Sequence, residues 1–400
     1  MVKEAAIQFY LLAYKLLFTF FNYLPLKEKV TFVVSFGDNS KYVYEEILRQ
    51  NKSVDVVVLY HGSSNRHFTE FNELTLIPMD SFNLIAFIKT NYHLATSKTI
   101  FVDNYFAFLS VTDFKEGVEC IQLWHASGAL KKFGLEDQSI TKRNRRAHER
   151  FLKVYGKFHK VVVGSDIMAN IFMKSFNLSK ENILRTGIPR TDFFYDERTQ
   201  NQIVDKLIKE NQDLKRKKKV LYAPTYRDNQ LDHFEIKLEL DQMFKELGNE
   251  YVVLLRLHPA IKKSVDYEKL YPGFVYDYSS STYDINDLLL IANYLITDYS
   301  SIPYEFSLLN KPMIFFAYDL EAYKQERGLM EGYEETVPGP VVKTTSEIIE
   351  LIKKDQFNLE QLKDYAGKWN KYSTGKSSQK LVRYVFNKEV EEKKVKRRAQ

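Results

Sequence analysis

Two histidines that follow apolar stretches are the residues of this chain best suited to chemistry. His125 comes after CIQLW and precedes three small residues, Ala126 to Gly128. His258 comes after YVVLLRL, with Pro259 next in the chain. A neutral imidazole accepts a proton from a hydroxyl near pH 7, and small neighbours let a substrate approach. We therefore interpret His125 as a candidate general base and His258 as a second catalytic candidate, with a structural histidine as the alternative for each.

Cations and hydroxyls follow other apolar stretches. KVLYAP leads to Thr225 and Arg227, and Arg256 precedes His258 by two residues on the same strand face. NYLITD ends on Asp298 and leads to Ser300. In open α/β sheets, ligands bind beyond the carboxyl ends of the strands. The inventory suits an anion such as a phosphate or diphosphate, and the candidates for binding it are Thr225, Arg227, Arg256, Asp298, Ser300, Ser301 and Glu305.

The segment after Asp298 predicts the start of a helix. Ser300 and Ser301 are good caps, and Pro303 suits a first helical turn, where its missing N–H is harmless. Free N–H groups at a helix start bind phosphate. Glu305 repels phosphate, so we interpret it as an acceptor for sugar hydroxyls such as those of ribose. The alternative is ordinary capping, with Glu305 favouring the helix dipole.

Residues around His125 suggest the side from which a second substrate approaches. Lys131 and Lys132 come shortly after it, where they meet developing negative charge. We interpret four residues as acceptor-side: Trp124, Ser127, Lys131 and Lys132. The remaining histidines are interpreted as surface or structural: His61, His67, His93, His148, His159 and His233.

The sequence predicts no metal and no cofactor. Asp103 and Asp298 are single carboxylates at strand ends, which orient a histidine as readily as they bind Mg²⁺. The chain has no HExxH, no paired cysteines, no Gly-rich dinucleotide fingerprint and no Walker loop. Cys120 is the only cysteine, so no intrachain disulfide forms, which fits a reducing, cytoplasmic side. Its apolar setting also makes it a poor nucleophile.

The elements that must position these residues alternate between strand and helix, which predicts an α/β fold with parallel sheets covered on both faces. Two sets of strand candidates predict two doubly wound domains. Gly187 and Pro189 break the pattern near residues 185–200, where ILRTGIP is expected to cross between the domains. The strand candidates are 30–36, 54–60, 99–105, 120–124 and 160–165, then 219–224, 251–257, 274–279, 293–298 and 312–317.

Composition fits a folded chain of more than one core, with 400 residues, 44% of them apolar and 28% charged. The net charge of +6 is concentrated in KRKKK (215–219) and in a tail from Lys393. Such clusters dock on anionic lipid or nucleic acid, or are only a solvated face. Because no zinc spacing, RNA-binding aromatic signature or helix-turn-helix cue is present, we expect an anionic membrane surface and no nucleic acid.

The N-terminal stretch AAIQFYLLAYKLLFTFFNYLPL (5–26) predicts a membrane-associating helix. Its central Lys15 disfavours a spanning helix, and it lacks a cleavable signal pattern. Gln8, Lys15 and Asn22 form one polar stripe, with Thr19 beside it. Two interpretations stay open, a helix in the bilayer interface or a helix buried between domains. In the first, the residues entering the acyl region are Phe9, Tyr10, Leu17, Phe20, Phe21 and Leu24.

A set of ordered motifs makes the chain similar to a known family: LWHASGALKKFG, TGIPRTD, YAPTYR, LHP and TDYSSIPYEFSLLNKP. They resemble the CDP-glycerol glycerophosphotransferases of wall teichoic acid synthesis, from about residue 30 to about residue 380. A finer similarity, to the glycerophosphate primases within that family, rests on VDNYFAFLSV, IQLWHASGALKKFGLED, VGSDIMANIFMKSF and WNKYSTGKSSQ. Ala126 departs from the glycine of many relatives, which implies a narrower acceptor pocket with the chemistry intact.

The resemblance implies a GT-B-like fold, two Rossmann-like domains with a cleft between them. The expected parts are a membrane-associating helix at 1–29, an acceptor-side domain at 30–194, a CDP-glycerol-binding domain at 195–387 and a basic tail at 388–400. It places the family's two functional histidines at His125 and His258. Its nucleotide-side residues correspond to Arg227, Asp298, Ser300, Ser301 and Glu305.

The resemblance also implies the reaction and its place. Glycerol phosphate would pass from CDP-glycerol to an undecaprenyl-diphosphate-linked N-acetylmannosaminyl-N-acetylglucosamine disaccharide, with release of CMP. The enzyme would sit peripherally on the cytoplasmic face of the cell membrane, where a complex with other teichoic acid enzymes is compatible with the resemblance. Three alternatives stay open: a polymerase of the same family, a GT-B glycosyltransferase using a nucleotide sugar, and a non-catalytic membrane-bound scaffold.

Overall fold

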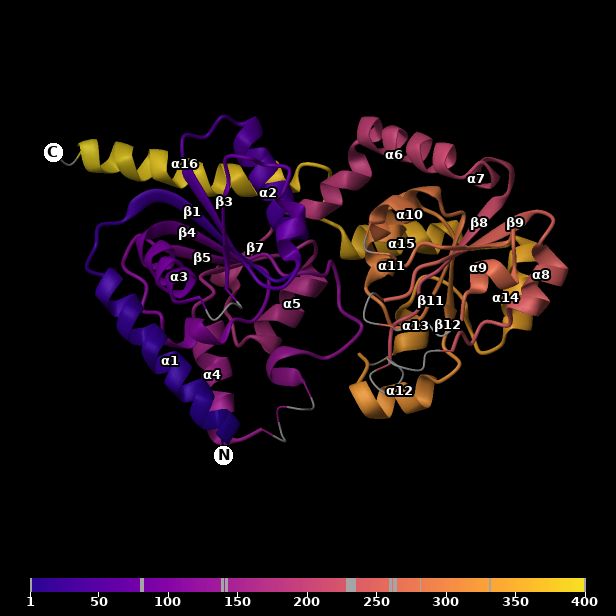
Figure 1. The fold of residues 1–400 in the computed structure, drawn as a ribbon, viewed down its shortest axis with the longest axis horizontal. Helices are drawn as coiled ribbons and strands as arrows, with labels where there is room; N and C mark the ends of the chain where they lie inside the picture. The colour runs from indigo at the N-terminus through magenta and orange to yellow at the C-terminus, as the bar shows by residue number, and fades with distance from the viewer. Residues whose placement is uncertain are drawn as a thin grey trace. The chain divides into compact units, whose positions relative to one another are not determined.

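The computed structural model (Figure 1) describes residues 2–79, 83–137, 140, 143–227, 235–258, 261, 265–280, 282–330 and 332–398. Its chain divides into two units. Unit 1 comprises 1–127, 133–192 and 371–400, and unit 2 comprises 128–132 and 193–370. His233, Pro259 and the side chains of the basic tail from residue 388 lie outside what the structure describes.

Unit 1 contains a seven-stranded parallel sheet in the order β3-β2-β1-β4-β5-β6-β7. Its central strands are runs of buried Val, Phe and Ile, as expected for a sheet covered on both faces. The strands are β1 (Lys27–Val34), β2 (Asp55–Tyr60), β3 (Thr75–Pro78), β4 (Ser97–Val102), β5 (Glu119–Gln122), β6 (Lys160–Val162) and β7 (Ile183–Leu184). The helices are α1 (Val2–Phe21), α2 (Asp38–Arg49), α3 (Leu84–Thr96), α4 (Arg145–Tyr155), α5 (Asp166–Ser175) and α16 (Ser377–Arg398).

Unit 2 contains a six-stranded parallel sheet in the order β10-β9-β8-β11-β12-β13. The strands are β8 (Lys218–Tyr222), β9 (Tyr251–Leu255), β10 (Val275–Asp277), β11 (Tyr294–Thr297), β12 (Met313–Phe316) and β13 (Val341–Val342). The helices are α6 (Glu197–Glu210), α7 (Asp213–Arg216), α8 (Leu240–Leu247), α9 (Tyr267–Leu270), α10 (Ile285–Ile291), α11 (Ile302–Phe306), α12 (Leu320–Arg327), α13 (Tyr333–Thr336), α14 (Thr345–Lys354) and α15 (Leu359–Trp369).

The predicted α/β class with two doubly wound parallel sheets is confirmed, and each of the predicted strands overlaps an observed one. Three short strands were not predicted: β3, β7 and β13. All three are edge strands, and β7 lies in the expected crossover ILRTGIP. At two residues each, β7 and β13 are too short to show a pattern of their own, and each pairs with one neighbouring strand.

The division into units differs from the expected domains at the C-terminus. The first boundary falls at 192/193 instead of 194/195. Residues 371–387, expected in the second domain, belong to unit 1. The reason is that α16 places three apolar side chains in the core of the seven-stranded sheet, namely Leu381, Val382 and Val385.

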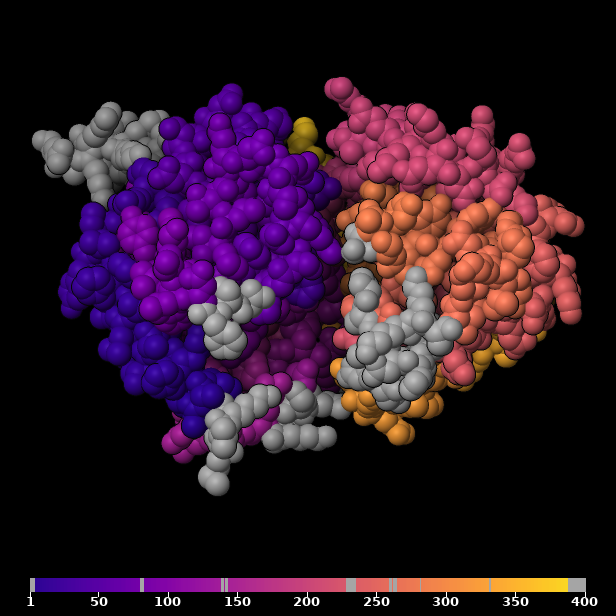
Figure 2. Space-filling view, in the orientation of Figure 1, coloured from indigo at the N-terminus to yellow at the C-terminus, as the bar shows by residue number. Residues whose placement is uncertain are grey.

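Helix α1 packs against unit 1 on one face and is apolar on the other as well. Leu11, Tyr14 and Phe18 are buried, and the Tyr14 ring stacks on Phe108 with centroids 4.7 Å apart. A second stripe is exposed, made up of Phe9, Leu12, Leu16, Phe20 and, just after the helix, Tyr23. Figure 2 shows the N-terminal residues, in indigo, at the surface of unit 1. Among the described helices, α1 alone is long and apolar enough to cross a membrane by length and composition.

The packed face corrects part of the predicted α1 orientation. Leu17 and Phe21 are half-buried against unit 1, and Phe21 meets Tyr92 of α3 with ring centroids 5.6 Å apart. Leu12 and Leu16 take their place on the exposed side. The error arose because the helix is apolar on nearly its whole circumference, so periodicity does not indicate which apolar face docks.

Candidate active site

The imidazole of His125 lies in the loop after β5 and is held on three sides. Its Nδ1 lies 3.1 Å from the carbonyl oxygen of Asp103. Its ring stacks between Phe36 and Trp124, with centroids 4.0 Å and 4.4 Å away. Burial, helped by the positive charge of Arg190, lowers the pKa of His125 to about 4. The imidazole is therefore neutral at pH 7.

The backbone around His125 is strained and fixed by long-range hydrogen bonds. Trp124 has a φ of +58°, in the left-handed region that a bulky residue rarely adopts. The side chain of Asn39 donates to the Trp124 carbonyl at 2.9 Å, and Arg190 donates to the His125 carbonyl at 2.9 Å. Such strain persists only where surrounding contacts over-determine it, and it gathers at functional sites.

The four residues predicted to lie on the acceptor side belong to two different units. Trp124 and Ser127 lie in unit 1, where Ser127 is fully buried. Lys131 and Lys132 belong to unit 2, whereas the expected acceptor-side domain at 30–194 included them. Their acceptor-side role stays a prediction. Lys131 pairs with Leu329 in an isolated antiparallel bridge, which anchors this short segment in the second unit.

Close packing against Tyr304, rather than substrate access, explains the glycine at position 128. A Cβ atom at this position would lie 2.5 Å from the ring of Tyr304. The glycine therefore lets the segment 128–132 pack on α11. Of the three small residues after His125, Ala126 is half-exposed and Ser127 and Gly128 are buried.

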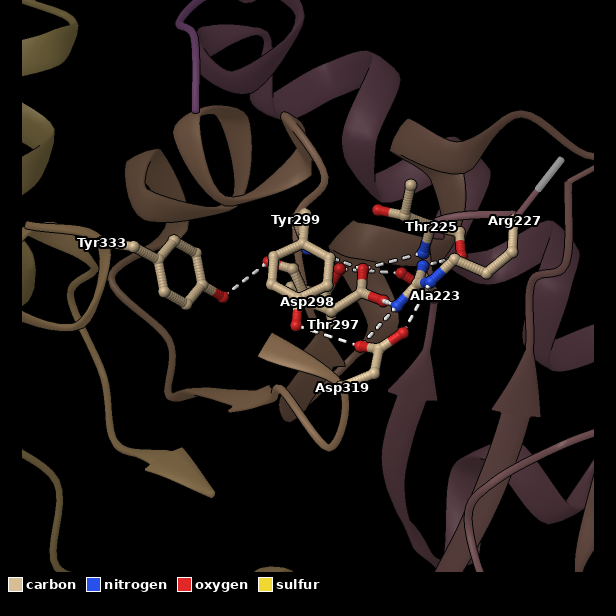
Figure 3. Close-up of polar contacts among 8 residues, drawn as sticks. All are labelled: Ala223, Thr225, Arg227, Thr297, Asp298, Tyr299, Asp319 and Tyr333. Carbon is tan, nitrogen blue, oxygen red and sulfur yellow. Dashed lines mark hydrogen bonds and ion pairs between the residues drawn. The ribbon is translucent and has the colours of Figure 1, made fainter. Parts of the chain in front are cut away.

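Arg227, a predicted phosphate ligand, makes hydrogen bonds within the protein (Figure 3). It is 7% exposed, its Nε donates to Asp319 at 2.9 Å, and one terminal nitrogen bridges Asp298 and Asp319 at 3.1 Å and 3.0 Å. Its other terminal nitrogen donates to the Thr225 carbonyl at 2.6 Å. Burial alone would lower the pKa of Arg227, but the hydrogen bond to Asp319 and the charge of Asp298 outweigh it and raise that pKa.

Asp298 joins the ends of two neighbouring strands. One carboxylate oxygen accepts from the N–H groups of Thr225 and Tyr299, at 2.8 Å and 2.7 Å. The hydroxyl of Tyr299 donates to Asp319, and that of Tyr333 donates to the Asp298 carbonyl (Figure 3). This network, with Arg227 at its centre, fixes the geometry of the loops that follow β8, β11 and β12.

Helix α11 begins as predicted, with Pro303 in its first turn. The hydroxyl of Ser300 accepts from the N–H of Ile302 at 3.2 Å. Ser301 occupies the N-cap position without a capping hydrogen bond from its side chain. Glu305 is 3% exposed, which sets it deeper than the prediction of a sugar-binding carboxylate suggests. The donor-binding role of these residues stays a prediction.

His258 is exposed at the end of β9, beside the half-buried Tyr226, with ring centroids 4.5 Å apart. Partial desolvation and then the charge of Arg256 lower the pKa of His258. Arg256 donates from one nitrogen to the carbonyls of Tyr278 and Ser280, both at 2.7 Å. It thus holds the exit of β10 beside the histidine.

Four residues of these sites were not singled out from the sequence: Phe36, Asn39, Arg190 and Asp319. Arg190 lies inside the quoted motif TGIPRTD, and Asp319 follows an apolar strand as Asp298 does. Only a search of every strand end for carboxylates would have found Asp319. In the part of the chain that the structure describes, no group of three or more His, Cys, Asp or Glu side chains is arranged to hold a metal ion.

Comparison with known proteins supplies a family. Residues 16–387 match the family described as CDP-Glycerol:Poly(glycerophosphate) glycerophosphotransferase. The chain is 38% identical over 368 residues to the teichoic acid glycerol-phosphate primase of Bacillus subtilis (strain 168), covering 92% of this chain and 94% of that one. It is 35% identical over 381 residues to the primase of the same name from Bacillus spizizenii, covering 95% and 98%.

Solved structures share the fold. The wall teichoic acid polymerase TagF aligns with a TM-score of 0.80 at 22% identity, covering 98% of this chain and 99% of that one. A UDP-GlcNAc 2-epimerase from Neisseria meningitidis aligns with a TM-score of 0.59 at 13% identity, covering 90% and 100%. At these identities the likeness concerns the fold alone.

Proposed function

Because the chain belongs to the CDP-glycerol:poly(glycerophosphate) glycerophosphotransferase family, we propose that it is a priming enzyme of wall teichoic acid synthesis. It transfers glycerol phosphate from CDP-glycerol to an undecaprenyl-diphosphate-linked N-acetylmannosaminyl-N-acetylglucosamine disaccharide. Two glycerol-phosphate primases that match this chain along nearly their whole length support the assignment.

The observation that carries the mechanism is the hydrogen bond between His125 Nδ1 and the Asp103 carbonyl. A carbonyl oxygen only accepts, so Nδ1 carries the hydrogen and Nε2 keeps its lone pair. Nε2 takes the proton of an acceptor hydroxyl as its oxygen attacks the glycerol-bearing phosphorus. The bond from that phosphorus to the bridging oxygen breaks, and CMP leaves with the electron pair.

Phosphoryl transfer depends mainly on positioning and on stabilising charge. We assign this work to unit 2, with His258 and the hydroxyls of Ser300 and Ser301 at the phosphoryl oxygens. Arg227 acts indirectly, without contacting the phosphate, because its N–H groups already donate to Asp298 and Asp319. In this role it shapes the loop that carries Thr225.

The test is the reaction of purified protein with CDP-glycerol and the lipid-linked disaccharide, followed by mass spectrometry of the lipid product. We expect the mass of one glycerol phosphate to be added, with release of CMP. His125→Asn should reduce turnover by about 10²–10⁴-fold, the usual contribution of a general base, and leave CDP-glycerol binding nearly intact. Full turnover by this variant would exclude His125 as the base.

A polymerase of the same family is the second candidate. The chain is 31% identical over 400 residues to the teichoic acid poly(glycerol phosphate) polymerase of Bacillus subtilis (strain 168), but covers only 51% of that longer protein. A ladder of products separated by one glycerol phosphate would favour this alternative. Turnover with a nucleotide sugar and none with CDP-glycerol would favour a glycosyltransferase instead.

We further propose that the exposed stripe of α1 lies in the interface of an anionic bilayer, where the lipid-linked acceptor resides. The first turns of α3 add exposed apolar side chains beside Phe87, whose ring contacts Tyr10 and Tyr14 of α1. Lys15 and Lys89 are exposed on the same two helices and suit anionic headgroups. The α3 residues are Leu84, Ile85 and Ile88.

A further inference from the structure

The turn after β1 uses its backbone N–H groups in an unusual way. The N–H groups of Ser35, Phe36 and Gly37 all donate to the carboxylate of Asp103, at 2.9 Å, 2.9 Å and 2.8 Å. Gly37 has a φ of +94°, in the region that favours glycine. Successive N–H groups of this kind form concave anion sites, which bind phosphate in many α/β proteins. Here a side chain of the protein itself fills the site.

Asp103 is suited to hold this turn firmly. It is 1% exposed, so water does not compete for its oxygens. Burial raises its pKa to about 6, while the three N–H groups oppose the rise. The carboxylate is therefore ionised at pH 7, and charge-assisted hydrogen bonds of this kind are about twice as strong as neutral ones.

The same residue reaches His125 through its main chain. The Asp103 carbonyl accepts from Nδ1, and this contact selects the tautomer that leaves Nε2 basic. The turn held by the Asp103 carboxylate carries Phe36, whose ring lies 4.0 Å from the imidazole at an angle of 15°. The carbonyl of Asp103 thus contacts the imidazole directly, and its carboxylate holds the turn whose Phe36 ring covers one face of the imidazole.

We propose that Asp103 is the positioning residue of His125, orienting the imidazole through its own carbonyl and through the Phe36 turn that its carboxylate fixes. The inference rests on the proposed role of His125 as the base. Asp103 does not touch the reacting atoms. A carboxylate that only stabilised the fold would affect unfolding and leave the tautomer and the turnover of the folded enzyme unchanged.

The experiment compares Asp103→Asn with the wild type and with Asp113→Asn. Asp113 is a carboxylate of the same unit, 83% exposed in its side chain and paired with Lys157. The readouts are kcat and KM for CDP-glycerol, thermal unfolding, and the imidazole ¹⁵N shifts of His125. We expect Asp103→Asn to lower kcat by about 10–100-fold, as small misplacements of a catalytic group do, with KM little changed. The ¹⁵N shifts should report a mixture of tautomers, and Asp113→Asn should match the wild type.

If Asp103→Asn does not fold, Phe36→Leu tests the proposal in its place, because this variant keeps the Asp103 carboxylate and its hydrogen bonds. It should lower kcat several-fold and move the titration midpoint of His125 upward, since one face of the ring loses its cover. A folded Asp103→Asn enzyme with wild-type kcat and a single tautomer would overturn the proposal. So would a Phe36→Leu enzyme with wild-type kcat and His125 titration. If His125→Asn is inactive in either case, the proposal of His125 as the base is retained and only the positioning role of Asp103 is excluded.

Discussion

At His125, neighbouring groups hold one imidazole nitrogen and the faces of the ring, and these contacts determine the protonation of the residue. Nδ1 is occupied by a backbone carbonyl, whereas the ring lies between two aromatic side chains. Aromatic cover removes water from the imidazole and disfavours its charged form. The residue is therefore ready to accept a proton at neutral pH, without first losing one.

The first prediction concerns this protonation. The pKa of His125 is lowered to about 4 by burial, so the imidazole should stay neutral as the pH is reduced from 8 to about 5. An NMR titration, with the His125 signal assigned by its loss in His125→Asn, measures the midpoint. Since the unfolded chain binds this proton near pH 6.5, the shift should also lower the free energy of unfolding as the pH falls below that value. A midpoint at or above 6.5 would contradict the geometry.

At the scale of the elements, Arg227 ties together the loops that follow three neighbouring strands. It pairs with Asp298 after β11 and with Asp319 after β12, and it donates to the carbonyl of Thr225 after β8. Asp298 is 2% exposed, so its charge depends on this partner. Removing one member of a buried ion pair leaves the other uncompensated.

The second prediction is that Arg227→Met lowers the free energy of unfolding by about 3–5 kcal/mol, the usual cost of breaking a buried pair. Urea denaturation followed by circular dichroism measures the loss. Lys353→Met is the matched control, because it removes the cation of an exposed ion pair with Glu246 in the same unit. We expect a far smaller loss there, because water screens both exposed charges. Equal losses in the two variants would show that Arg227 is not the centre of a buried network.

The two faces of α1 determine how membrane binding must be tested. Deleting residues 1–26 would strip Leu11, Tyr14 and Phe18 from unit 1, and the truncated protein would expose their partners. A loss of membrane binding in that variant would then have two causes. Substitutions confined to the exposed stripe avoid this ambiguity.

The third prediction concerns the triple variant Leu12→Ser, Leu16→Ser and Phe20→Ser. It should move the protein from the floating to the soluble fraction in flotation with vesicles containing anionic lipid. Each large side chain that enters an apolar phase contributes about 1.5–3 kcal/mol, so three account for most peripheral binding. Leu270→Ser, at a position 60% exposed in unit 2, should leave flotation unchanged. Unchanged flotation of the triple variant would assign α1 a purely structural role.

At the scale of the whole molecule, the chain passes between the two units more often than a simple two-domain protein requires. It enters unit 2 at residue 128, returns to unit 1 at 133, and crosses again at 193 and 371. The segment 128–132, which belongs to unit 2, begins three residues after His125. The candidate base is thus tied by the chain to a segment anchored in the unit that carries the predicted donor-binding residues.

The fourth prediction tests that anchor. Gly128→Ala should lower the free energy of unfolding by about 1–3 kcal/mol, because the new Cβ would overlap the Tyr304 ring. It should also lower kcat, since the displaced segment adjoins His125. Gly367→Ala in α15 is the control, because its new Cβ would meet no atom within 4 Å beyond its own helix backbone and chain neighbours, and it should be neutral or slightly stabilising. Wild-type stability and kcat in Gly128→Ala would show that the segment adapts without cost.

The sequence by itself determined the α/β class, the two sets of strands and the family, and it predicted the two candidate histidines. These features depend on local patterns, since a buried parallel strand is a run of apolar residues and the loop after it supplies the chemistry. Tertiary structure decided which residues meet. His125 finds its partner 22 residues away at Asp103, and Arg227 finds Asp319 at a distance of 92 residues. It also decided which apolar face of α1 docks and why Gly128 is small. No local pattern encodes such contacts, because they arise only when separate strands and loops pack side by side.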